Sequence, residues 1–249
     1  MARVRTVVSG HYGFTQIAVI LAGIECYELA RKVMTPNWPV AVRHAHDIVS
    51  VERFAHLAWE QPLQQAFLGV PDLVRALNVF YFVGHFLLTG IFFVWLYHRS
   101  RPAYRTFRNG FLTASAIAVV IHWRFPTAPP RLADVGLVDT LRQLSGVDIG
   151  SPGSASFSNP VAAVPSLHAG FALGVGIGLC LCARHLAWKL IGVIYPLAVV
   201  LTTIVTGNHF VLDAFAGMLV LGLGFALASL LFERDGARLV PATRGGAVR

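Results

Sequence analysis

Long apolar runs are the feature that most constrains this sequence, because about 20 apolar residues are enough to cross a lipid bilayer as a helix. Only 13% of the 249 residues are charged, whereas a soluble domain carries about a quarter. The sequence therefore predicts an all-α polytopic membrane protein, and no linker or repeat divides residues 1–249 into more than one domain. The six predicted transmembrane helices are 14–30, 73–97, 107–125, 164–183, 187–206 and 209–232.

The first predicted span is the weakest of the six, because Glu25 and Glu28 interrupt it. A cleaved signal peptide is the alternative for this run. No small-residue cleavage site follows the run cleanly, so a retained span is the preferred interpretation.

Positive charge predicts how the spans are oriented. Loops rich in Lys and Arg stay in the cytoplasm, and a cluster separates the second span from the third: Arg99, Arg101, Arg105 and Arg108. Both termini are therefore expected to be cytoplasmic. The net charge of +8 does not indicate nucleic acid binding, because the Arg residues lie between apolar runs. A composition rich in Ala, Arg, Val and Gly is typical of bacteria with GC-rich genomes, which predicts a bacterial plasma membrane.

Three segments lie outside the spans. Residues 43–68 are moderately amphipathic and predict a helix at the outer membrane interface; a re-entrant or packed loop helix is the alternative. Residues 127–163 form a long outer loop rich in Pro, Gly and Ser, and loops of this length are often functional. Residues 233–249 are expected to be a disordered cytoplasmic tail.

Polar residues at the outer ends of the spans are the candidate functional groups, because ionisable side chains at membrane depth are costly. His209 and Asp213 are four residues apart and so share one face of a helix. A carboxylate that accepts a proton from one imidazole nitrogen leaves the other nitrogen available as a nucleophile. The alternative is a purely structural His–Asp pair.

Two further groups are expected on the same side of the membrane. Ser166 and His168 lie at the start of the fourth span, where free amides and the helix dipole favour an anion. Arg131 follows a Pro-rich helix end, and its planar guanidinium suits a phosphate. Their alternative roles are a simple helix cap for Ser166 and an interfacial side chain for Arg131.

The order and spacing of these residues resemble the phosphatidic acid phosphatase type 2 (PAP2) superfamily. Its first signature is matched by Arg124 and Arg131, with Arg in place of Lys, and its third by His209 and Asp213. The segment 165–168 matches the second signature with Leu in place of Gly. The resemblance covers roughly 52–217.

The branch of inositol phosphorylceramide synthase-like proteins is closer still. Its members resemble this chain in the Pro-Ser-Leu-His segment, in the His-aromatic spacing of the third signature, and at Asn78, Tyr81 and His85. One departure is that Thr202 and Thr203 stand where the third signature has Ser-Arg. Arg124 is the candidate replacement for that missing Arg.

The resemblance implies a mechanism and a substrate class. His209 would attack a lipid phosphate and form a phosphohistidine, Asp213 would orient its ring, and His168 would act as general acid. Arg131, Arg124 and Ser166 would bind the phosphate, and the expected chamber-lining residues are Asn78, Tyr81, His85 and Asn208. The resemblance implies no metal and no other cofactor.

Three functions remain open at this point. The favoured one is hydrolysis of a lipid phosphomonoester or pyrophosphate, of the phosphatidate or polyprenyl type. The second is transfer of an inositol phosphate-type head group between lipids. The third is a non-catalytic carrier of lipid phosphates, which the His/His/Asp set argues against. The expected partners are the lipid phosphate substrate and membrane lipids, with no nucleic acid, and no oligomeric state is predicted.

Overall fold

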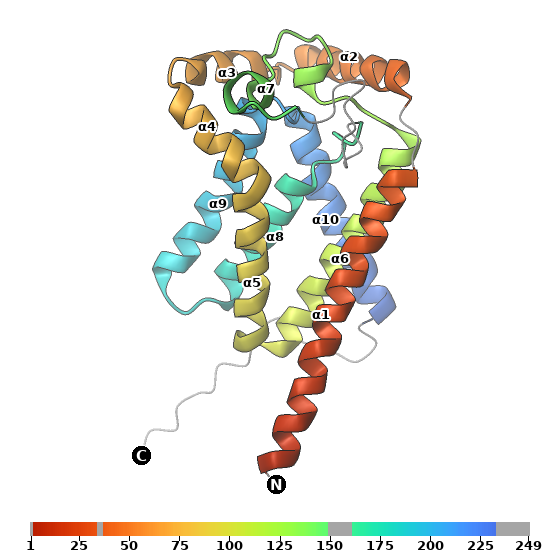
Figure 1. The fold of residues 1–249 in the computed structure, drawn as a ribbon, viewed down its shortest axis with the longest axis vertical. Coiled ribbons are helices and arrows are strands. Elements are labelled where there is room, and N and C mark those ends of the chain that lie inside the picture. Colours follow the sequence, from red (N-terminus) through yellow and green to blue (C-terminus); the bar gives the residue numbers. More distant parts are fainter. Residues whose placement is uncertain (1, 34–36, 149–160, 233–249) are drawn as a thin grey trace.

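The fold is a bundle of long helices closed at one end by short ones (Figure 1). The computed structural model describes residues 2–33, 37–148 and 161–232, and these ranges contain no β-strand, only one isolated bridge. The long helices are α1 (Ala2–Val33), α4 (Pro71–Val79) continued through a π-helical turn (Phe80–Gly84) into α5 (His85–Arg99), α6 (Arg101–Arg124), α8 (Leu167–Cys182), α9 (Leu186–Val205) and α10 (Val211–Phe232). Each of the six predicted spans is thus helical.

Among the described residues, four helical segments are long and apolar enough to cross a membrane: Gly13–Ala30, Pro71–Arg99, Leu186–Val205 and Val211–Phe232. The other two predicted spans correspond to α6 and α8. Helix α6 carries Arg residues over its first two turns, and α8 is apolar but has only 16 residues. The described residues therefore contain at least four helical segments that could span a membrane. The arrangement with six spans stays a prediction.

Small residues let the central helices approach one another closely, as is common in membrane bundles. A Cβ added at Gly170 in α8 would lie 2.6 Å from the carbonyl oxygen of Gly217 in α10. Gly224, farther along α10, packs in the same way on Gly110 in α6. These contacts fix α10 between α6 and α8, and aromatic side chains such as Phe92 and Phe107 fill the core beside them.

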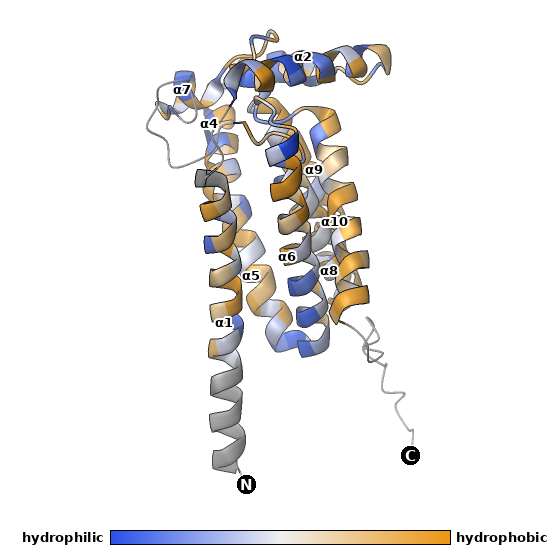
Figure 2. Cartoon of the chain, turned by 90° about the vertical axis from the view of Figure 1, so that its right-hand side faces the viewer, coloured by the Kyte–Doolittle hydropathy of each residue, from blue (hydrophilic) through white to orange (hydrophobic). Residues whose placement is uncertain are grey.

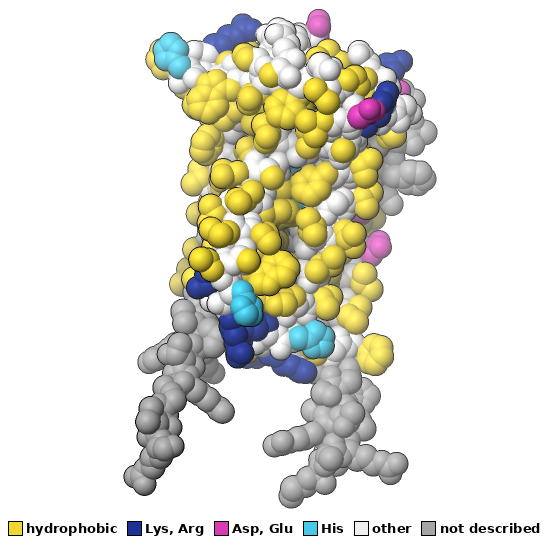
Figure 3. Space-filling model, turned by 90° about the vertical axis from the view of Figure 1, so that its left-hand side faces the viewer, with side chains coloured by type: hydrophobic (Ala, Val, Ile, Leu, Met, Phe, Trp, Pro, Cys, Tyr) yellow, Lys and Arg dark blue, Asp and Glu magenta, His cyan; other side chains and the backbone are white. Residues whose placement is uncertain are grey.

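The outer surface of the bundle carries a broad apolar belt (Figures 2 and 3). Large apolar side chains such as Leu219 and Ile194 are more than half exposed there. Lys and Arg side chains gather below the belt, at the end where α1 begins and α10 ends (Figures 1 and 3). An apolar belt with charged ends is the surface expected of a protein that crosses a bilayer.

A cap of short elements covers the other end of the bundle (Figure 1). It consists of α2 (Trp38–Phe54), α3 (Glu60–Leu68), a 3-10 turn, η2 (Pro130–Leu132), and α7 (Thr140–Ser145). The predicted outer loop 127–163 therefore contains two helical elements, and its residues 149–160 lie outside the described residues. The predicted tail 233–249 lies outside them as well.

The predicted interfacial helix 43–68 differs from the structure in two ways. It is two helices, α2 and α3, separated by a turn in which His56 has a positive φ of 58°. Two of its acidic side chains also face inward: Glu52 and Glu60 are buried, whereas Val51 and Trp59 are each 54% exposed. The reason is that the surface under the cap contains amides at the start of α10 that have no acceptor within their own helix.

Candidate active site

The starts of α8 and α10 meet directly beneath the cap. The amide of Ser166, the N-cap of α8, donates a 2.9 Å hydrogen bond to the carbonyl oxygen of Asp213 in α10. Gly217 allows this approach, because a Cβ at that position would overlap the Ser166 carbonyl group. The second and third sequence motifs are therefore joined through their backbones.

His209 lies two residues before α10 and is almost fully buried. Its Nδ1 atom is 3.0 Å from the carbonyl oxygen of Ala163 and 3.4 Å from Oδ2 of Asp213. A carbonyl oxygen can only accept, so Nδ1 carries the proton and Nε2 carries a lone pair. Nε2 has no hydrogen-bond partner among the described residues. The expected tautomer is therefore favoured, but by Ala163 as much as by Asp213.

Asp213 has a second task besides facing His209. Its Oδ2 atom accepts a 2.9 Å hydrogen bond from the amide of Phe210, so the carboxylate closes the turn that carries the imidazole. Its Oδ1 atom is buried with no hydrogen-bond partner in the described part of the chain. Asp213 thus fixes both the ring and the backbone turn of His209.

The surroundings of His209 keep its ring neutral. Burial, helped by the nearby positive charge of Arg131 and opposed by the hydrogen bond to Ala163, lowers the pKa of His209 to about 4. A neutral imidazole is the form that can act as a nucleophile.

His168 lies in the first turn of α8 and faces the same space. Its ring centroid is 5.7 Å from that of His209 and stacks on the Tyr81 ring at 4.2 Å with an interplanar angle of 20°. His85 lies 5.1 Å away and is held by a 2.8 Å hydrogen bond with the hydroxyl group of Tyr195. The structure therefore brings together the two catalytic histidine candidates and two of the four expected lining residues, Tyr81 and His85.

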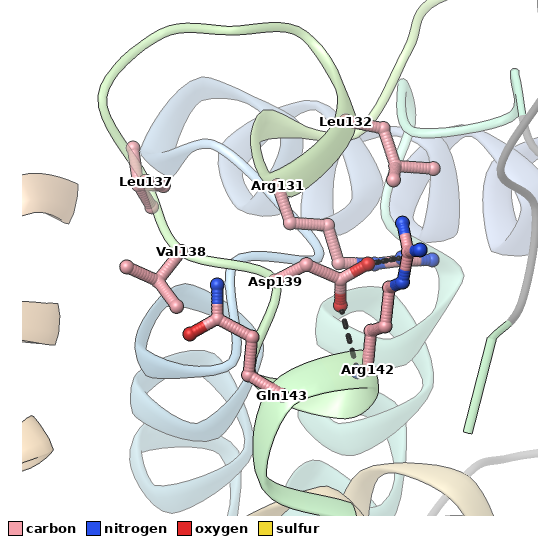
Figure 4. Close-up of a pocket in the computed structure, with 7 residues that line it drawn as sticks. All are labelled: Arg131, Leu132, Leu137, Val138, Asp139, Arg142 and Gln143. Atoms are coloured by element: carbon pink, nitrogen blue, oxygen red, sulfur yellow. Dashed lines mark hydrogen bonds and ion pairs between the residues drawn. The ribbon is translucent and has the colours of Figure 1, made fainter. Parts of the chain in front are cut away.

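Arg131 is fixed by two side chains. Its Nε atom donates to Oδ1 of Asn208 at 3.0 Å, and one terminal nitrogen pairs with Asp139 at 2.9 Å. Figure 4 shows this ion pair at a cavity of about 570 Å³ that is also lined by Arg142 and Gln143 of α7. Asn208, expected as a lining residue, thus positions Arg131 instead.

The remaining predicted site residues have other surroundings. Asn78 is buried, but its side-chain amide bonds to the Thr140 carbonyl and the Ser145 hydroxyl groups and so anchors α7 rather than lining the chamber. Ser166 is fully buried, and its hydroxyl oxygen accepts from the Ala169 amide at 3.4 Å, the geometry of a helix cap. Arg124 ends α6 with an exposed side chain, and no interaction links it to His209 among those of the described residues.

Two functional candidates were missed by sequence reasoning, namely Glu52 and Glu60. Glu60 accepts a 2.8 Å hydrogen bond from the Val211 amide, and Glu52 accepts one of 2.8 Å from the Leu212 amide. These partners are about 150 positions apart in the sequence, and no local pattern connects them. Within the described residues, no group of three or more His, Cys, Asp or Glu has an arrangement that could hold a metal ion.

Comparison with known proteins gives one match. A family model described as the PAP2 superfamily matches residues 46–227, which include every candidate site residue above. No curated protein and no solved structure matches the chain.

Proposed function

Because the chain belongs to the PAP2 superfamily, a family of phosphatases and phosphotransferases, we propose that it hydrolyses a lipid phosphomonoester or pyrophosphate through a phosphohistidine on His209. The observation that carries this proposal concerns the two ring nitrogens of His209. Its buried Nε2 atom has no hydrogen-bond partner within the described part of the chain, and its Nδ1 atom is held by Ala163 and Asp213. An imidazole held in this way presents its lone pair in a fixed direction, as a nucleophile requires.

The proposed first step forms the enzyme intermediate. Nε2 of His209 attacks phosphorus, a P–N bond forms, and the P–O bond to the lipid breaks. His168 gives its proton to the departing lipid oxygen, and its ring is next to that of His209, with the ring centroids 5.7 Å apart. Asp213 stabilises the imidazolium that develops on His209.

In the proposed second step, water attacks the phosphohistidine. His168 now accepts a proton from the water, the P–N bond breaks, and inorganic phosphate is released with His209 neutral again. Arg131 neutralises the phosphate oxygens, and Asn208 and Asp139 hold its guanidinium in place. Each step therefore uses a group that the described residues bring to the same end of the bundle.

The helix starts favour one location for the phosphate. Carboxylates occupy the first amides of α10, whereas only the neutral Ser166 caps α8. The positive end of the α8 dipole is thus available to an anion. We place the substrate phosphate over the first turn of α8, beside His168 and His209.

A second candidate function is transfer of a phosphate-bearing head group to another lipid or polyol. The cavity beside Arg131 favours it, because Arg142 and Gln143 offer polar groups next to the proposed phosphate site. We also propose that the site faces the outside of a bacterial plasma membrane, because the opposite end of the bundle has the cluster Arg99, Arg101, Arg105 and Arg108 where α5 is followed by α6.

The test is to incubate the purified protein with labelled lipid phosphates, with and without inositol or glycerol. Release of free phosphate supports the phosphatase, and a new phosphodiester that appears only with the acceptor supports the transferase. Binding of the lipid without either product would overturn both and leave a carrier.

A further inference from the structure

Three carboxylates satisfy three consecutive amides where α10 begins. The Phe210 amide donates to Asp213 within its own turn, and the amides of Val211 and Leu212 donate to Glu60 and Glu52 at 2.8 Å each. The two glutamates come from different helices of the cap and are 4% and 0% exposed. The turn that carries His209 is therefore held by two glutamates of the cap as well as by Asp213 of α10.

We propose that Glu52 and Glu60 are positioning residues for the nucleophile, which act together on the first turn of α10. This inference rests on the proposed phosphohistidine mechanism and extends it to the cap. Their hydrogen bonds fix residues 210–212, and residue 209 precedes this turn directly. An error of about 1 Å in the position of a reacting atom can cost 100-fold in rate. The two glutamate hydrogen bonds therefore affect catalysis and not only stability.

The glutamates also keep anions away from α10. A helix start with free amides attracts phosphate, and at α10 that phosphate would lie next to Asp213. With Glu52 and Glu60 in place, the amides of α10 are occupied, so the substrate phosphate is directed to α8. The cap thus selects which of two adjacent helix starts receives the substrate.

The surroundings of Glu52 favour its protonated form. Burial raises the pKa of Glu52 well above its usual value, the charge of Glu60 raises it further, and the hydrogen bond from Leu212 opposes the shift. A protonated Glu52 resembles a neutral amide of the same shape, so Gln can replace it and still accept from the Leu212 amide.

Replacement by Gln gives a specific signature. In Glu52→Gln or Glu60→Gln, the Gln oxygen still accepts from its amide, and the other glutamate is unchanged. We expect each single Gln variant to keep kcat within about threefold of the wild type. In the double Gln variant neither helix of the cap supplies a glutamate to the start of α10, and kcat is expected to fall by about tenfold or more.

Truncation of either glutamate to Ala removes the carboxylate that accepts the backbone hydrogen bond. Glu52→Ala and Glu60→Ala are expected to lower kcat by about 10- to 100-fold and to change KM by less than about threefold, since substrate binding is on α8. Asp47→Ala is the matched control, because Asp47 is an exposed carboxylate on the same helix as Glu52. The measurement is steady-state turnover of phosphatidate in detergent micelles.

The rate of amide hydrogen exchange tests the same inference without a measurement of catalytic turnover. Peptides covering 206–217 should exchange faster in the two Ala variants and at the wild-type rate in the single Gln variants. Wild-type kcat in both Ala variants, single Gln variants as impaired as the Ala variants, or a fully active double Gln variant would each overturn the inference. If the Ala variants fail to fold, the kcat values of the single and double Gln variants test the inference.

His209→Ala separates this inference from the proposed function. A wild type that does not turn over lipid phosphate, or a His209→Ala variant as active as the wild type, refutes the proposed function. The hydrogen-exchange rates of peptides covering 206–217 then still test whether Glu52 and Glu60 hold the first turn of α10. Turnover that depends on His209 but not on either glutamate refutes only the positioning role.

Discussion

The starts of α8 and α10 are neighbours in space but are capped in opposite ways. A single neutral hydroxyl group, that of Ser166, caps α8, whereas three carboxylates occupy successive amides of α10. The same helix-end electrostatics therefore serve two purposes. At α10 they fasten a catalytic turn to the protein, and at α8 they remain available to a substrate anion.

The largest expected effect comes from removing the nucleophile between the two helix starts. His209→Ala should insert into the membrane normally and lose turnover of lipid phosphate by roughly 10⁴-fold or more, because it removes the proposed nucleophile. His46→Ala, at an exposed position of α2, is the control. Full activity of the His209 variant would refute the mechanism.

The next largest effect is expected when the start of α8 is given a carboxylate, as the start of α10 has. Ser166→Asp places a carboxylate at the N-cap of α8, where Asp is as good a helix cap as Ser. The negative charge should repel the substrate phosphate and lower kcat/KM by about 100-fold or more. Ser166→Asn is the neutral control, and thermal unfolding checks that both variants are folded. Equal activity of the two variants would mean that the phosphate binds elsewhere.

Separating the two helix starts should have a smaller effect. Gly217→Ala introduces a methyl group that overlaps the Ser166 carbonyl group. The helices must move apart, so we expect a loss of about 1–3 kcal/mol in unfolding free energy and about a tenfold loss in kcat. Gly222→Ala on the same helix meets nothing within 4 Å and should be neutral. Unchanged melting of the Gly217 variant would contradict the close approach.

The smallest expected effect is a dependence of stability on pH. Burial lowers the pKa of His209 to about 4 in the folded chain, whereas an unfolded His titrates near 6.5. Between these values the unfolded state binds more protons, so unfolding free energy should fall as pH falls from 6.5 to 4, by about 1 kcal/mol per pH unit. Chemical unfolding of the wild type and of His209→Gln at several pH values measures the difference. Identical slopes would show that His209 is accessible to protons in the fold.

The sequence was sufficient for the features that repeat along it or that are close in it. Apolar runs marked all six long helices, because a bilayer requires continuous apolar length. A four-residue spacing paired His209 with Asp213 for a local geometric reason, although the pair sits at a helix start rather than within the helix. Family signatures placed His168 in the same site.

Contacts between distant segments could not be found in this way. Periodicity shows that residues share a helix face, but it does not show which distant residues they contact, so the burial of Glu52 and Glu60 against α10 could not be predicted. Asn78 and Asn208 were recognised as polar residues near the site. Their partners, α7 and Arg131, come from a loop whose path no periodic pattern describes.

The position of α1 has a consequence for how the protein is made. Helix α1 lies along α6, only 6% of its candidate span is buried inside the bundle, and the family match begins after it, at residue 46. A helix that needs few partners can enter the bilayer during synthesis, before the rest of the chain has left the ribosome. We expect α1 to set the direction in which the later helices are threaded, so that its contribution is to biogenesis and the finished enzyme uses it little.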